Sequence, residues 1–137
     1  MIPLLFTDPI PELVNALPAQ LLELGEESVV VKRVTPDERP NRFVLLVGDG
    51  GPRTREVHRL YRVRAQVWAT HANKQTDWDG VRELAKHVQY VLERFARTST
   101  SIATVTDSTG PDAVQDPSGV EYRFLSVEYQ LRGIPAP

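Results

Sequence analysis

The chain has 137 residues, is 41% hydrophobic and 25% charged, and contains no cysteine. A composition this close to the globular average excludes a collagen, a disordered chain and a disulfide-bonded scaffold. The missing thiols also exclude cysteine nucleophiles and thiolate zinc sites. The length predicts a single domain over residues 1–137, large enough to fold without a metal or a cross-link.

The net charge of −2 conceals a polarity along the chain. Residues 1–28 contain five acids and no base, whereas residues 29–65 contain nine bases and four acids. This asymmetry is either ordinary variation over solvated faces or a sign of complementarity. In the second case one region of a subunit meets an oppositely charged region of its neighbour.

The first predicted element is a helix. The N-terminal sequence, MIPLLFTDPIPEL, lacks the basic start and the long apolar run of a signal peptide or a membrane span. Asp8, Pro9 and Pro11 suit a helix start, and apolar residues recur at near-helical spacing up to Leu24. Pro18 lies inside this run and is expected to kink or split the helix, because it removes an intrahelical hydrogen bond.

Three strands are predicted between residues 28 and 70. β-Branched residues favour strands over 28–34 and 42–47, joined by a loop over 35–41. The sequence Gly48-Asp49-Gly50-Gly51-Pro52 is predicted to be a turn, within a loop over 48–55. Apolar and polar residues alternate over 56–70, which predicts a long strand. Its apolar face comprises Val57, Tyr61, Val63, Ala65, Val67 and Ala69.

A long amphipathic helix is predicted over residues 77–97. Its apolar residues follow the i, i+3, i+4, i+7 pattern and are Trp78, Val81, Leu84, Ala85, Val88, Val91, Leu92 and Phe95. Thr76 or Asp77 is expected to cap its N-terminus, where the acids Asp77 and Asp79 suit the helix dipole.

The C-terminal part is predicted to form two further strands. A short strand over 102–106 leads into a loop over 107–119, which is rich in glycine, proline and aspartate. The last strand covers 120–132, with Leu125, Val127, Tyr129 and Leu131 on one face. Residues 133–137 are expected to form a loose tail.

These elements predict an α+β fold: about five mostly antiparallel strands with two helices packed on one sheet face. The other face would carry Arg62, Arg64, Trp68, Tyr122 and Phe124. A mixed aromatic and charged sheet face is unusual if it is left bare to water.

The sequence contains no recognisable catalytic pattern. The histidines lack metal-ligand spacing, and the glycines at 48–51 are followed by Pro52 and Arg53 rather than by the lysine of a phosphate-binding loop. Asp77 and Asp79 are explained by helix capping. We therefore predict no enzymatic activity, no cofactor and no metal site.

An interaction surface is the alternative that the residues favour. The candidates are Arg53, Arg55, Arg59, Arg62, Arg64 and Trp68 on or near the third strand, with Asp107, Asp112, Val114 and Asp116 in the 107–119 loop. Arginines beside aromatics suit a nucleic acid or a protein partner. Their alternation divides the positive charge between two faces, which favours a protein partner. The loops over 35–41, 48–55 and 107–119 are candidate docking elements.

Three stretches of sequence carry a resemblance to a known family. They are RVRAQVWA at 62–69, DGVRELA at 79–85, and GPD at 110–112 followed by YRFLSVEYQLRG at 122–133. Together with the order of the elements they resemble the tail terminator proteins of long-tailed, non-contractile bacteriophages, the siphoviruses. The likeness covers most of residues 25–133.

The resemblance implies a structural virion protein, assembled in the bacterial host cytoplasm, that forms a hexameric ring at the head-proximal end of the tail. Such a ring caps the tail tube, ends polymerisation of the major tail tube protein and presents a surface to the head-side connector. DNA passes through the lumen without specific binding, and no membrane, reaction or cofactor is involved. Related neck and tail-completion proteins, a small nucleic-acid-binding module and an unrecognised enzyme remain as alternatives.

Overall fold

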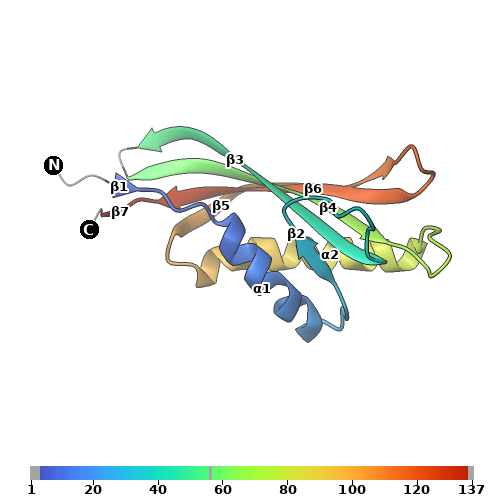
Figure 1. The fold of residues 1–137 in the computed structure, drawn as a ribbon. Helices are drawn as coiled ribbons and strands as arrows, with labels where there is room; N and C mark the ends of the chain where they lie inside the picture. Colours follow the sequence, from blue (N-terminus) through green and yellow to red (C-terminus); the bar gives the residue numbers. More distant parts are fainter. Residues whose placement is uncertain (1–3, 56, 136–137) are drawn as a thin grey trace.

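Two helices lie on one face of a five-stranded sheet in the computed structural model, which describes residues 4–55 and 57–135 (Figure 1). The elements in chain order are β1 (Leu4–Leu5), α1 (Ile10–Glu23), β2 (Val30–Lys32), β3 (Arg42–Arg55), β4 (His58–Ala69), α2 (Trp78–Thr98), β5 (Ile102–Gln115), β6 (Glu121–Arg132) and β7 (Ile134–Pro135). The strand order is β2-β3-β4-β6-β5, and only the β2–β3 pair is parallel. The predicted α+β class is confirmed.

The helix α2 forms where the amphipathic pattern predicts it. Asp77 is the N-cap, and its side chain accepts a hydrogen bond from the Gly80 amide at 3.0 Å. Seven apolar side chains of α2 are buried: Val81, Leu84, Ala85, Val88, Val91, Leu92 and Phe95. Trp78 is an exception to the predicted apolar face, because it lies in the first turn and is 55% exposed.

The helix α1 is continuous from Ile10 to Glu23, although Pro18 lies inside it. The expectation that Pro18 would split the helix is therefore wrong. Leu13, Leu17 and Leu21 are buried along one stripe, and packing of this stripe holds the two halves together.

The strand β3 corrects the prediction of a turn at residues 48–52 and of a loop over 48–55. It runs for 14 residues through the glycines and ends at Arg55. Glycine is needed here for space: a Cβ on Gly48 would overlap the Tyr61 ring of β4, and one on Gly50 would meet the Arg59 side chain at 3.2 Å. The glycines therefore make room for side chains of the neighbouring strand.

The strand β5 corrects the prediction of a loop over 107–119. It continues to Gln115, so only residues 116–120 connect it to β6. A register shift between Thr109 and Asp112 accommodates Gly110, whose φ is +86°, and Pro111. Proline is tolerated because β5 is an edge strand.

The C-terminal segment also differs from its prediction. Ile134 and Pro135, expected in a loose tail, pair with Leu5 and Leu4 as a two-stranded antiparallel sheet. The Gly133 amide donates to the Val57 carbonyl at 2.8 Å, which ties this small sheet to the β3–β4 connection. Residues 136 and 137 of the predicted tail lie outside the described residues.

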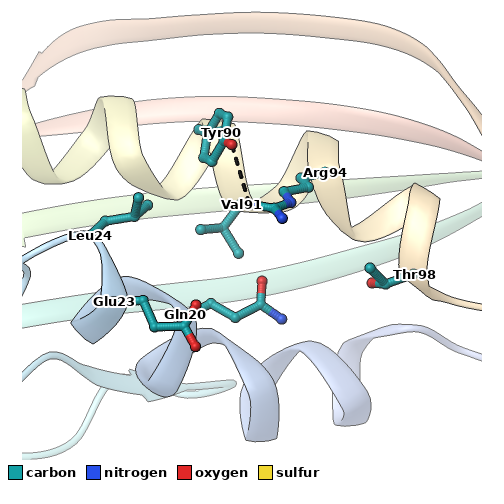
Figure 2. Close-up of a pocket in the computed structure, with 7 residues that line it drawn as sticks. All are labelled: Gln20, Glu23, Leu24, Tyr90, Val91, Arg94 and Thr98. Carbon is teal, nitrogen blue, oxygen red and sulfur yellow. Dashed lines mark hydrogen bonds between the residues drawn. The ribbon is translucent and has the colours of Figure 1, made fainter.

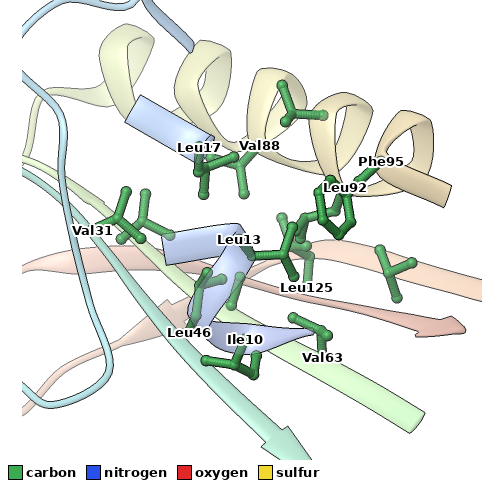
Figure 3. Close-up of a cluster of buried hydrophobic side chains, with 14 of the residues drawn as sticks. Ile10, Leu13, Leu17, Val31, Leu46, Val63, Val88, Leu92, Phe95 and Leu125 are labelled. Atoms are coloured by element: carbon green, nitrogen blue, oxygen red, sulfur yellow. The ribbon is translucent and has the colours of Figure 1, made fainter. Parts of the chain in front are cut away.

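One continuous core fills the space between the helices and the sheet (Figure 3). Leu13 and Leu17 of α1 face Val88 and Leu92 of α2, above sheet residues such as Leu125. The predicted apolar faces of 56–70 and 120–132 are confirmed, except that Val57 is 48% exposed.

Candidate interaction surfaces

The outer face of the sheet is the side opposite the helices, and no helix in the described part of the chain covers it (Figure 1). Cross-strand register places Asp49, Arg62, Glu128 and Asp107 in one row across four strands. A second row holds Val47, Arg64, Ser126 and Thr109. The middle of this face is therefore charged.

Arg62 is the centre of these charges. Its Nη1 donates to Ser126 Oγ at 3.1 Å and its Nη2 to Glu128 Oε2 at 3.1 Å, while Asp107 Oδ2 lies 3.6 Å from Nη2. The neighbouring Arg64 forms an ion pair with Asp49. Both arginines thus have carboxylate partners within the chain, which reduces the positive charge available to a phosphate.

Trp68 lies on the same face but is almost fully buried. Its ring stacks on Tyr122 with centroids 4.3 Å apart, and the Arg39 guanidinium lies 3.6 Å above it. Phe43 and Val120 complete this second apolar cluster. Burial lowers the pKa of Arg39, and the charge of Asp116 partly offsets this effect. Trp68 is one of the predicted interface candidates, and Arg39 from the loop between β2 and β3 covers its ring.

Arg53 and Arg59 lie toward the opposite face, at the end of the sheet where β1 and β7 meet. They are cross-strand partners. Arg59 Nε donates to the Gly51 carbonyl at 2.9 Å, and the Arg53 guanidinium lies 5.1 Å from the Phe6 ring centroid. Arg55 pairs through its backbone with His58, and its side chain lies outside the described structure. The predicted division of the arginines between two faces is confirmed for the side chains described.

The acidic candidates lie along β5 and in the following turn. Asp112 is opposite Phe124 and Val114 is opposite Tyr122, so both belong to the outer face. Asp116 accepts hydrogen bonds from the Ser118 hydroxyl at 2.6 Å and the Ser118 amide at 3.0 Å, and these bonds lower the pKa of its carboxyl. The residues of the predicted docking loop over 107–119 therefore belong partly to the strand β5 and partly to the short turn after it.

An apolar patch marks the end where Arg53 and Arg59 lie. Leu5 and Ile134 are register partners, 55% and 40% exposed, and Val57 next to them is 48% exposed. Nothing in the sequence pattern joins these residues, because they come from both ends of the chain and from the β3–β4 connection.

The helix layer carries a shallow groove between α1 and α2 of about 250 Å³ (Figure 2). Its lining residues are Gln20, Glu23, Leu24, Tyr90, Val91, Arg94 and Thr98. Arg94 Nη1 donates to the Tyr90 hydroxyl at 3.3 Å. The groove thus combines one acid and one base with two apolar side chains.

A buried acid that the sequence analysis missed joins both helices to the sheet. Glu26 is 7% exposed, accepts a hydrogen bond from Arg42, and has Oε1 2.8 Å from His87 Nδ1. It follows α1, whereas Arg42 begins β3 and His87 lies in α2. The only sequence feature that could have indicated this buried site is a charged residue directly after the helix.

Within residues 4–55 and 57–135, no group of three or more histidine or acidic side chains is placed to hold a metal ion, and no helix is long and apolar enough to cross a membrane. Comparison with protein-family models and with curated proteins finds no match to this chain.

Proposed function

We propose that this chain is a structural virion protein and not an enzyme: a subunit of a hexameric ring that caps the tail tube of a siphovirus. The observation that carries the proposal is the uncovered outer sheet face, on which an ion-pair network adjoins a buried aromatic cluster. An antiparallel sheet often leaves one face in water, but that face is usually polar, so the aromatic residues on this one favour assembly with other chains. The sequence resemblance supplies the kind of assembly.

The two ends of the sheet support a subunit that sits between two partners. The end with β1 and β7 carries Arg53, Arg59 and Arg132 beside the exposed Leu5 and Ile134. The opposite end, at the β5–β6 turn (Figure 1), carries Asp112, Asp116 and Glu121, of which Glu121 pairs with Arg123 and Asp116 lies near Arg39. Two ends that differ in this way, one basic and apolar and one of mixed charge, suit two different partners, here the major tail tube protein and the head-side connector.

Another neck or tail-completion protein remains the alternative, because the same surfaces would serve it. A nucleic-acid-binding module is less favoured, since Arg62 and Arg64 already hold carboxylates. In the proposed ring DNA passes through the lumen without specific contacts. The protein would be found at the head-proximal end of the tail.

The test is deletion of the coding gene from its phage genome, with electron microscopy of the tails. We expect tails that are too long or that lack heads, and a plasmid copy of the wild-type gene should restore normal tails. In wild-type phage, this chain should be found among the proteins of purified virions. Averaged images of the capped tail end should show sixfold symmetry. Tails of normal length joined to heads in the deletion strain would overturn the proposal.

A further inference from the structure

On each side of the sheet, a long stretch of strand is hydrogen-bonded to a neighbouring strand along one edge only. β5 pairs only with β6, and nine of its 14 residues are exposed. On the other side β2 pairs with residues 43–45 of β3, so from Leu46 onward β3 has β4 as its only strand partner among the residues described. A free edge presents backbone N–H and C=O groups to which another strand can bind.

The two free stretches lie at the same level of the sheet. Gly48 is opposite Val63, Val63 is opposite Val127, and Val127 is opposite Ser108. Proline limits both stretches, because Pro52 and Pro111 have no N–H to donate. This leaves residues 46–51 of β3 and 104–109 of β5 as windows of similar length. Residues 47–50 share rows with residues 105–109, where a register shift between Val105 and Asp107 adds one residue to the β5 window.

The strand directions also match. β3 is antiparallel to β4, β4 to β6 and β6 to β5, so β3 and β5 run in opposite directions. A second copy, turned about an axis roughly parallel to the strands, would place its β3 antiparallel to the β5 of the first. Antiparallel addition is the more stable kind of pairing.

We propose that successive copies of this chain join edge to edge, with residues 46–51 of β3 in one copy paired to residues 104–109 of β5 in the next. The contact joins two different edges, so it repeats from copy to copy and can close into a ring. This inference rests on the proposed function and deepens it, because it names the contact that builds the ring.

The charges near the join are compatible with this pairing. Asp49 and Asp107 lie in the same row, but Arg64 binds the first and Arg62 lies 3.6 Å from the second. A slip of two residues, about 7 Å, places Asp107 opposite Val47 and keeps both side chains on the outer face.

The absence of cysteine allows a clean cross-linking test. The double variant Val47→Cys/Thr109→Cys carries one thiol on each edge, in the same row on the outer face. Within one chain the two positions are three strand spacings apart, about 14 Å. A bismaleimide whose span is about 8 Å tolerates the two-residue slip and links only neighbouring copies.

We expect a ladder of covalent dimers, trimers and larger species on a denaturing gel, from purified protein at its highest soluble concentration or from virions carrying the variant. Each single variant should stay unlinked, and a mixture of the two should give dimers only. The matched control Gln66→Cys/Thr109→Cys has one thiol on the central strand β4 and should give no ladder.

Dimers from a single variant would show a two-fold contact and overturn the inference. The absence of a ladder from both the purified protein and the virions would overturn it as well. Virions that contain the double variant without cross-links would also overturn it and leave the proposed function standing. A ladder from purified protein, together with the absence of the chain itself from purified virions, would support the edge contact and contradict the proposed function.

Discussion

The Tyr61 ring of β4 lies across Gly48 of β3, in the space that a Cβ atom at position 48 would need. The Tyr61 hydroxyl reaches past the glycine and donates to Asp8 Oδ1 at 2.7 Å. The same Asp8 oxygen accepts from the Ile10 amide at 2.9 Å, at the start of α1. A glycine in a strand therefore permits a contact that positions a helix.

Gly48→Ala should lower the free energy of unfolding by about 1–3 kcal/mol, the usual cost of overpacking. The measurement is urea unfolding of four proteins: wild type, Gly48→Ala, Tyr61→Ala and the double variant. Most of the penalty should disappear in the Tyr61→Ala background, because the ring is the obstacle. An equal penalty in both backgrounds would locate the cost elsewhere.

Pro18→Ala should raise the free energy of unfolding by about 1–3 kcal/mol. Proline inside a helix removes a backbone hydrogen bond and costs about 3 kcal/mol, and the continuous α1 bears that cost. The matched control is Pro11→Ala in the first turn, where the missing N–H has no intrahelical partner. Thermal melting should show a gain for the first variant and almost none for the second; equal shifts would contradict the explanation.

Leu84→Asp should unfold the domain or prevent its expression. Leu84 is fully buried between α2 and the sheet, and an unpaired carboxylate there costs several kcal/mol. That is a large share of the about 5–15 kcal/mol that stabilises a typical domain. Glu83→Asp introduces the same residue on the exposed side of the helix, and its melting temperature should change by no more than a few degrees.

The stability should fall in alkaline solution because of Tyr129. Its buried hydroxyl donates to the Leu92 carbonyl at 2.5 Å, and burial raises the pKa of Tyr129 well above its ordinary value of about 10. The unfolded chain loses this proton near pH 10 while the folded chain keeps it. The contribution of Tyr129 to the free energy of unfolding is therefore fully present below about pH 10 and falls as the pH rises above it.

Urea unfolding between pH 8 and 11.5 measures this decline. Tyr129→Phe should lose about 1 kcal/mol at pH 8 with the hydrogen bond, yet show a shallower fall above pH 10. Tyr61 contributes in the same direction, since burial and the bond to Asp8 raise its pKa. Parallel curves for wild type and Tyr129→Phe would remove Tyr129 as a cause.

The sequence predicts best where local periodicity decides the structure. The helix α2 and the strand β6 carry apolar residues at regular intervals, and both form at nearly the predicted bounds. The strands predicted over 42–47 and 102–106 form, but the predictions of where β3 and β5 end were wrong, because glycine and proline are common in turns. Gly48 serves Tyr61 on another strand, and the bulge at Gly110 accommodates Pro111 within an edge strand.

The sequence predicts which residues form the candidate interaction surface but not how they are arranged on it. Alternation placed Arg62 and Arg64 on the outer face, and the structure agrees. Their partners Glu128 and Asp49 depend on which strands are neighbours, which a single sequence does not reveal. The same holds for Trp68, which Arg39 covers from a distant loop.

The pairing of Leu4 with Pro135 brings the first and last described residues side by side. A short flexible linker could join Pro135 directly to Leu4 in a permuted chain, with new ends opened in the turn between Asp116 and Gly119. Such a circular permutant would keep every strand of the five-stranded sheet. It would move any fused tag from one end of the molecule to the other, and so test which end must stay unobstructed for the proposed assembly.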